Sequence, residues 1–332
     1  MKPLDDAKFS GTKDVDERLK IDSANLQPWI DEYVPNAGKI KAIEQFKGGQ
    51  SNPTYKIITE SKNLVLRRKP PGKLLPSAHA VDREYKVITA LYETDVPVPK
   101  TYGLCEDDDV AGTAFFVMDF LDGDLFWDPM IPSMTNRDRT EIYKNKNKTL
   151  AKLHSVEYKK IGLEDYGKPG NYVARQVSRW SKQYRASETD NIEAMNNLID
   201  WLPKNIPDDD ETTIVHGDYR LDNMILKNNE VIGILDWELS TLGHPIADFS
   251  YHCLSWRTQE AFWDQAKLKE LGIPTEREYM EMYCENSGKD LSKNWEFYMA
   301  FNMFKIAGIL QGILGLSLIH ISEPTRQNKI SY

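Results

Sequence analysis

The sequence predicts an α+β protein of two lobes, in which a small mixed N-terminal lobe carries an antiparallel sheet and a larger C-terminal lobe is mainly helical. Short apolar segments separated by turn residues fill the first third of the chain, which is typical of such a sheet. Helical apolar spacing dominates the rest, interrupted by a polar segment at 216–223 and a short apolar segment at 231–235. The 332 residues, 40% of them hydrophobic, are enough to fill two cores.

The chain opens with an extension, residues 1–38, in which one amphipathic helix is expected. The apolar side chains between residues 23 and 33 recur at helical spacing and share one face: Leu26, Trp29, Ile30 and Tyr33. Because a helix buries its apolar face, we expect this one to dock on the lobe that follows.

Residues 39–120 form the predicted small lobe. Its elements are expected in this order: strands at 43–46, 54–58 and 64–67, a helix at 82–92, and a strand pair that ends at 115–118. The lobe boundary is placed near Phe120, because the chain turns mainly helical after Asp122-Gly123.

The large lobe is predicted to span residues 121–316, with an apolar stretch at 306–321 near its end. We expect a buried helix there rather than a membrane span, because the stretch contains Gln311 and His320 and is shorter than the ~20 apolar residues that cross a bilayer. Residues 317–332 resemble translated sequencing-adapter sequence, so we expect this tail not to be native.

Composition argues against several classes of partner. A net charge of −9 gives no support to binding of nucleic acid or of an anionic membrane. The three cysteines, Cys105, Cys253 and Cys284, are widely spaced and read as reduced core thiols rather than as disulfides or zinc ligands. Together with an N-terminus that lacks a hydrophobic signal segment, they favour a cytoplasmic location.

Two segments carry the chemistry. His216, Asp218 and Asn223 lie in the polar segment, and the short strand 231–235 leads to Asp236. Phosphoryl transfer needs a carboxylate beside the attacking hydroxyl and oxygen ligands for a divalent metal, roles that suit Asp218 as the base and Asn223 with Asp236 as ligands of Mg²⁺. The alternative is a polar turn in which the aspartates only form turns and cap helices.

In these two segments the chain resembles the aminoglycoside phosphotransferase and choline kinase-like family, whose catalytic loop has the same His-x-Asp-x-x-x-x-Asn pattern. It is closer to one branch, the phosphotransferase-like domain found upstream of some acyl-CoA dehydrogenases and as stand-alone bacterial proteins. The segments that resemble this branch are 64–72, 78–84, 175–180 and 237–245, within a similarity that covers residues 25–313. The resemblance implies a bilobal protein kinase-like fold and a kinase that uses ATP and Mg²⁺.

The resemblance also suggests nucleotide contacts in the small lobe. A turn between two strands could cover the phosphates with Gly48, Gly49, Ser51 and Asn52, although two adjacent glycines are more often an ordinary turn. Arg67 stands where such folds usually carry a phosphate-contacting lysine, and Glu84 on the next helix is its expected ion-pair partner. Arg68 and Lys69 are competing candidates, although a strand would place Arg68 on the face opposite to Arg67. The backbone from Met118 to Phe120 is expected to meet the adenine ring.

Three other polar residues are expected to be structural. His216 is interpreted as a scaffold for the catalytic loop, and Asp248 resembles the acidic residue of the family that braces this loop. His154 falls on an apolar helix face and is expected to be a packed core histidine.

The sequence gives fewer indications of the molecule that accepts the phosphate. Arg175, Arg179 and Lys182 recur at offsets of four and seven, so a helix would put them on one face, where they form either a solvated surface or a site for an anionic substrate. The branch resemblance implies a hydroxyacyl-CoA or a related small hydroxyl compound and a link to an acyl-CoA dehydrogenase. The alternatives are a catalytically weak nucleotide-binding partner of such a dehydrogenase, or a choline- or homoserine-type kinase.

Overall fold

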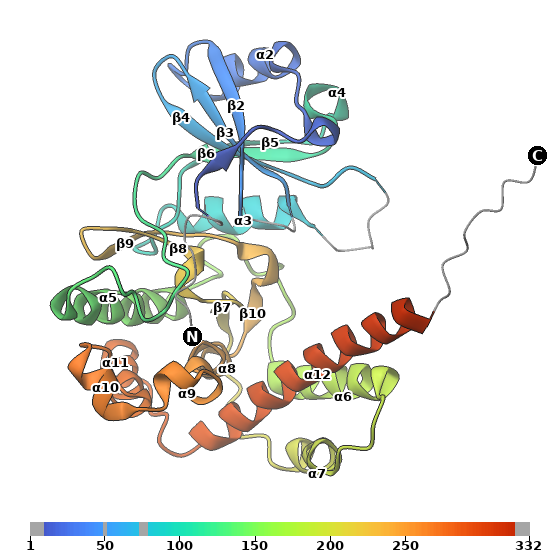
Figure 1. The fold of residues 1–332 in the computed structure, drawn as a ribbon, viewed down its shortest axis with the longest axis vertical. Helices are drawn as coiled ribbons and strands as arrows, with labels where there is room; N and C mark the ends of the chain where they lie inside the picture. The colour runs from blue at the N-terminus through green and yellow to red at the C-terminus, as the bar shows by residue number, and fades with distance from the viewer. Residues whose placement is uncertain (1–9, 49–51, 73–78, 323–332) are drawn as a thin grey trace, which may run out of the picture.

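The computed structural model describes residues 10–48, 52–72 and 79–322, and the side chains of these ranges up to residue 315. Figure 1 shows two stacked lobes, with a twisted sheet above and a helical lobe below. The predicted α+β, two-lobe architecture is therefore confirmed. Gly49 and Ser51 lie outside the described residues.

The small lobe contains a six-stranded sheet in the order β1-β2-β3-β4-β6-β5. Its neighbouring strands all pair antiparallel. The strands are β1 (Thr12–Lys13), β2 (Ile40–Phe46), β3 (Thr54–Thr59), β4 (Asn63–Arg68), β5 (Thr101–Cys105) and β6 (Phe115–Asp119), and the helices are η1 (Glu17–Leu19), α2 (Ser23–Tyr33), α3 (Val81–Leu91) and α4 (Asp108–Ala111).

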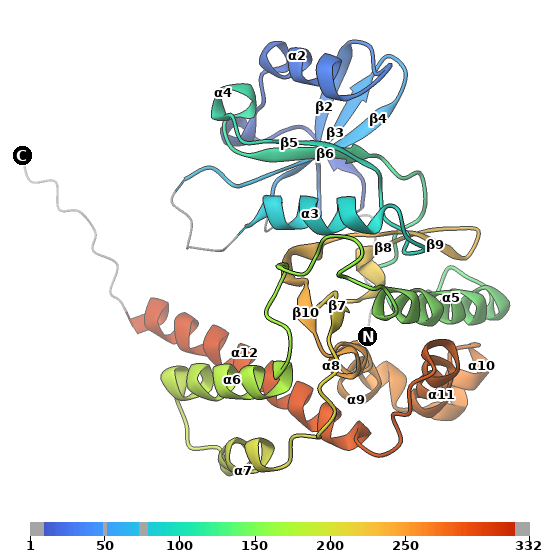
Figure 2. The same ribbon diagram turned by 180° about the vertical axis from the view of Figure 1, so that it is seen from behind.

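Alternation along β4 divides the core of the small lobe between the two faces of the sheet. Leu64 and Leu66 pack in a cluster with Leu26 and Ile30 of α2, all four fully buried. Val65 faces the opposite side and joins the cluster that contains α3. Successive strand residues point to opposite faces, so Arg67 follows Val65 toward α3, the side that meets the large lobe (Figure 2).

The large lobe is mainly helical and contains two small antiparallel sheets, β7 with β10 and β8 with β9. Its strands are β7 (Thr213–Val215), β8 (Met224–Lys227), β9 (Glu230–Ile234) and β10 (Thr241–Gly243). Its α-helices are α5 (Asn136–His154), α6 (Tyr172–Ser187), α7 (Glu193–Trp201), α8 (Pro245–His252), α9 (Ser255–Thr258), α10 (Gln265–Glu270), α11 (Glu276–Ser287) and α12 (Trp295–Ser322). Short 3₁₀ turns are η2 (Leu202–Lys204), η3 (Leu221–Asn223), η4 (Trp237–Leu239) and η5 (Glu260–Phe262).

Helix α12 corrects one expectation. The helix predicted at 306–321 begins earlier, at Trp295, and packs against α6 and α8 on one side only. Its other side exposes four large apolar residues: Met303, Leu310, Ile313 and Leu314. The prediction of a buried helix was therefore wrong for this face, because apolar composition alone does not show how much of a helix finds a partner.

By length and composition, α12 is the one helix in the described part of the chain that could cross a membrane, over Trp295–Gly315 with 44% of the window buried. Core helices pass the same test, so this is weak evidence for a span.

Candidate active site

The predicted catalytic loop runs from the end of β7 to the start of β8, and a glycine fixes its first bend. Gly217 has a φ of +84°, and a Cβ atom there would lie 2.8 Å from the carbonyl oxygen of Leu239. Both the backbone conformation and the close approach therefore require glycine. The bend presents Asp218 half-buried; burial raises the pKa of its carboxyl above the usual range, and Arg220, 3.7 Å away, opposes the rise.

Asn223 and Asp236 lie at the same end of the β8–β9 hairpin. The backbone N–H of Leu235 donates to the carbonyl oxygen of Asn223 at 2.8 Å, which aligns the two segments. The Asn223 side-chain nitrogen donates to the Asp218 carbonyl oxygen at 2.9 Å and to its carboxylate at 3.2 Å. Predicted base and predicted ligand are thus in direct contact.

This donor set suits a hard divalent cation. Because the Asn223 amide nitrogen points to Asp218, its amide oxygen is the atom left to coordinate metal beside the Asp236 carboxylate. Within the described ranges, no group of three His, Cys, Asp or Glu side chains is placed to hold a metal. An ion at this hairpin would therefore depend on nucleotide phosphates to complete its shell, as Mg²⁺ sites in kinases do.

Asp236 has an unusual backbone conformation. Its φ of 62° lies in the left-handed region, which aspartate tolerates better than most residues. Its carboxylate accepts from the Arg67 guanidinium at 2.5 Å, across 169 positions of sequence. The bend after β9 thus turns the predicted metal ligand toward the small lobe.

Arg67 also pairs with Glu84, as predicted, with 2.8 Å between Nε and the carboxylate. Glu84 is buried and receives a second contact from the Asn52 side-chain nitrogen at 2.9 Å. Burial raises the pKa of Glu84 to about 7, a rise that Arg67 opposes. Arg68, by contrast, donates on the far face of the sheet to the hydroxyl oxygen of Tyr55, as strand alternation requires.

The other residues predicted to contact a nucleotide make contacts within the small lobe. Gly48 follows β2, and the Asn52 side chain turns inward to Glu84 and His79 rather than outward. Met118 is buried in β6, opposite Val65 of β4, and the ring of Phe120 stacks on another phenylalanine of the small lobe. Their contacts with a nucleotide remain predictions.

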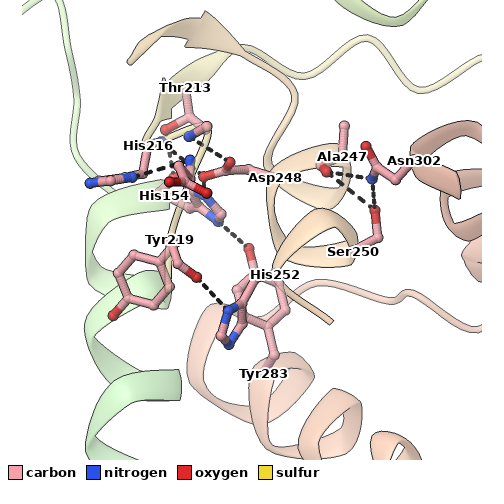
Figure 3. Close-up of polar contacts among 12 residues, drawn as sticks. His154, Thr213, His216, Tyr219, Ala247, Asp248, Ser250, His252, Tyr283 and Asn302 are labelled. Carbon is pink, nitrogen blue, oxygen red and sulfur yellow. Dashed lines mark hydrogen bonds and ion pairs between the residues drawn. The ribbon is translucent and has the colours of Figure 1, made fainter. Parts of the chain in front are cut away.

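One buried carboxylate, Asp248 of α8, holds the predicted catalytic loop (Figure 3). Its two oxygens accept from the backbone N–H groups of His216 and Gly217, each at 2.9 Å, and one of them also contacts the His154 ring at 3.2 Å. Burial alone would raise the pKa of Asp248, but His154 and His216 hold it below its usual range. The His154 ring contacts the Tyr283 hydroxyl at 2.6 Å on its other side.

A lysine that sequence reasoning did not single out lies beneath the loop. Lys146 of α5 is 3% exposed, and its ammonium sits 4.3 Å from the ring centroid of Tyr143. Burial lowers the pKa of Lys146 to about 7. No motif marks it, because a lysine in a polar helix such as α5 is ordinarily solvated.

The predicted substrate residues share one open, shallow face of α6 with Ala174, Ser178 and Gln183. The Arg175 guanidinium donates to backbone carbonyl oxygens, including that of Lys168 at 2.6 Å. Arg179 is exposed, with its guanidinium 5.6 Å from the ring centroid of Trp180, and Lys182 is exposed beside it.

A sheet-bearing lobe over a helical lobe, with a loop carboxylate, an Asn–Asp hairpin and an Arg–Glu pair facing one another between them, defines a kinase-like phosphotransferase. The chain belongs to the phosphotransferase enzyme family (APH), whose model matches residues 42–283.

Its relatives include longer proteins. Acyl-CoA dehydrogenase family member 10 of Mus musculus is 47% identical over 281 residues, which cover 82% of this chain and 26% of that protein. Acyl-CoA dehydrogenase family member 11 of Homo sapiens is 40% identical over 324 residues, covering 93% of this chain and 42% of that protein. The chain thus spans less than half the length of these relatives.

Solved structures agree with the fold. A Ralstonia eutropha protein, provisionally described as an aminoglycoside phosphotransferase, is 47% identical, with a TM-score of 0.83 and 92% of both chains covered. At 11% identity, choline kinase of Cryptosporidium parvum has a TM-score of 0.57 over 90% of this chain and 97% of its own. An ADP-bound aminoglycoside phosphotransferase, 14% identical, has a TM-score of 0.58 over 91% and 93%.

Proposed function

We propose that this chain is an ATP- and Mg²⁺-dependent kinase that phosphorylates the hydroxyl group of a small molecule, with hydroxyacyl-CoA as a candidate acceptor. The observation that carries the proposal is the contact of Asn223 with Asp218 at the end of the hairpin that also bears Asp236. The ADP bound to one structural neighbour supports a nucleotide as the donor.

Each residue has a defined task in this reaction. Asp218 orients the acceptor hydroxyl and takes its proton, for which the raised pKa of its carboxyl is suited. Arg67, held by Glu84, contacts the donor phosphates. A magnesium ion held by Asn223 and Asp236 would neutralise charge on those phosphates.

The decisive experiment replaces Asp218 by Asn and measures ATP-dependent ADP release with a panel of hydroxyl compounds. We expect kcat to fall by about 10²–10⁴-fold, the contribution typical of a general base, while nucleotide affinity stays nearly unchanged because the metal ligands remain. Asp200→Asn, an exposed aspartate on α7, is the matched control. Loss of nucleotide binding in the Asp218 variant would show that the assignment is wrong.

The basic face of α6 supports an anionic acceptor such as a coenzyme A thioester. Cationic aminoglycosides fit it poorly, because they would call for clustered carboxylates. Arg179→Glu should therefore raise KM for hydroxyacyl-CoA, and an unchanged KM would remove α6 from the acceptor site.

A second candidate is a nucleotide-binding partner module of an acyl-CoA dehydrogenase. The names of the longer relatives favour it, as does an arginine at position 67 where a lysine is usual. Nucleotide binding without ADP release for any acceptor would support this function over the first. A choline- or homoserine-type kinase would differ only in the acceptor that the panel identifies.

A further inference from the structure

Helix α12 is fixed against the catalytic lobe at two points. The Asn302 side-chain nitrogen donates to the Ala247 carbonyl oxygen and to the Ser250 hydroxyl of α8, both at 2.8 Å (Figure 3). Two and a half turns later, Gln311 donates to the carbonyl oxygen of Ser187 at 2.8 Å, at the end of α6. These buried amides set the rotation of α12, so the side chains between them face α8 and α6 in a defined way.

Lys305, one turn after Asn302, lies over the ring of Tyr251 on α8, with 4.1 Å between Nζ and the ring centroid. Tyr251 follows Asp248 by three residues, so it stands on the turn of α8 next to the one that holds the catalytic loop. Burial lowers the pKa of Lys305, whereas the charges of Asp248 and Asp218 raise it, so both carboxylates lie within electrostatic reach of its ammonium.

This lysine has no counter-charge in direct contact. In the part of the chain that the structure describes, no carboxylate lies within ion-pair distance of Lys305, Arg179 or Lys182. Arg179 acts on the pKa of Lys305 as a second positive charge. A partly buried ammonium beside another cation is costly unless an anion joins it.

We propose that Lys305 determines acceptor specificity by binding an oxyanion of the hydroxyl substrate, with Arg179 extending the same basic surface. The inference rests on the proposed phosphotransfer, in which Asp218 holds the acceptor hydroxyl. It restricts the acceptor to hydroxyl compounds that carry a carboxylate or a phosphate, and disfavours neutral and cationic alcohols.

The test compares three compounds of equal length: ω-hydroxyhexanoate, hexanediol and ω-aminohexanol. Binding to the wild-type protein is measured by calorimetry with ATP absent, and KM is measured separately from ADP release. Coenzyme A is titrated as a fourth ligand, so that a carboxylate site and a phosphate site are told apart. The variants are Lys305→Met, which keeps chain length, Lys305→Arg, which keeps the charge, and Lys152→Met, an exposed lysine of α5, as control.

We expect the wild type to bind the hydroxy acid or coenzyme A at least tenfold more tightly than the neutral and cationic alcohols. Lys305→Met should remove this preference, Lys305→Arg should restore most of it, and Lys152→Met should leave it unchanged. Anion-selective binding without ADP release would support the inference while overturning the proposed kinase activity. The inference would be overturned if the wild type bound all the compounds equally, or if Lys305→Met lost the same fraction of affinity for every compound. The comparison of compounds on the wild type tests the inference even if a variant does not fold.

Discussion

Replacing Asp248 by Asn removes the charge on which the catalytic loop rests. The amide oxygen can keep the bonds from the His216 N–H and the His154 ring, but the amide nitrogen would then face the Gly217 N–H, which now bonds a carboxylate oxygen at 2.9 Å. A buried donor without an acceptor costs about 1–3 kcal/mol, and the two remaining bonds lose the roughly 1 kcal/mol each that a charged acceptor adds. We therefore expect a loss of about 3–5 kcal/mol in the free energy of unfolding.

Urea denaturation followed by tryptophan fluorescence measures this loss, and ADP release measures the effect on turnover. Because a shift of about 1 Å in a reacting group can cost ~10²-fold, kcat should fall by that order while the folded variant still binds nucleotide. Asp200→Asn should change stability by less than about 0.5 kcal/mol. If Asp248→Asn were as stable and as active as the wild type, the loop would not depend on this carboxylate.

Substitutions at three further positions test other parts of the structure. Gly217→Ala would place a Cβ 2.8 Å from the Leu239 carbonyl oxygen at a φ of +84°, so about 1–3 kcal/mol of stability and at least tenfold in kcat should be lost; unchanged melting and ADP release would contradict this. The folded pKa of Lys146, about 7, lies below its unfolded value of 10.5, so the unfolded chain binds more protons between these pH values and wild-type stability rises with pH across them. Lys146→Met should therefore be more stable than the wild type at pH 7 by a few kcal/mol, at about 1.4 kcal/mol per pKa unit. Urea denaturation at pH 7 and at pH 9 should show that this difference in stability is smaller at pH 9. The same difference at both pH values would refute the lowered pKa of Lys146. Arg67→Met leaves Glu84 buried without its cation and should cost about 3 kcal/mol, whereas Arg67→Lys should cost less, and equal melting temperatures for both would contradict the ion pair.

Local patterns were sufficient for much of the fold. The short apolar run at 64–66 predicted a strand, and strand geometry predicted that Arg67 and Arg68 point in opposite directions, because neighbouring strand residues face opposite sides. The extent of burial along α12 was not predictable, because it depends on which helices pack against it. Composition shows what a face could bury, and only the tertiary fold shows what it does bury.

The same distinction applies to the candidate site, where contacts within one loop could be predicted from the sequence and contacts between distant segments could not. Asp218 and Asn223 are five residues apart, so one loop brings them together and spacing alone could predict their association. The contact between Arg67 and Asp236 joins residues 169 positions apart, and Lys305 of α12 lies over the ring of Tyr251 on α8, 54 positions earlier in the chain. A single sequence carries no periodic signal for such distant pairs.

The placement of α2 and α12 sets limits on how this protein can be trimmed. A fragment restricted to residues 40–287 would contain strands β2 to β6 of the sheet, the β8–β9 hairpin and Asp248. It would nevertheless lack α2, which covers the buried side chains of Leu64 and Leu66. It would also lack α12, which covers the face of α8 that Asn302 contacts. Newly bared apolar surface of this kind drives aggregation. A fragment chosen for expression should therefore retain both flanking helices, even though neither contributes a residue to the predicted catalytic loop.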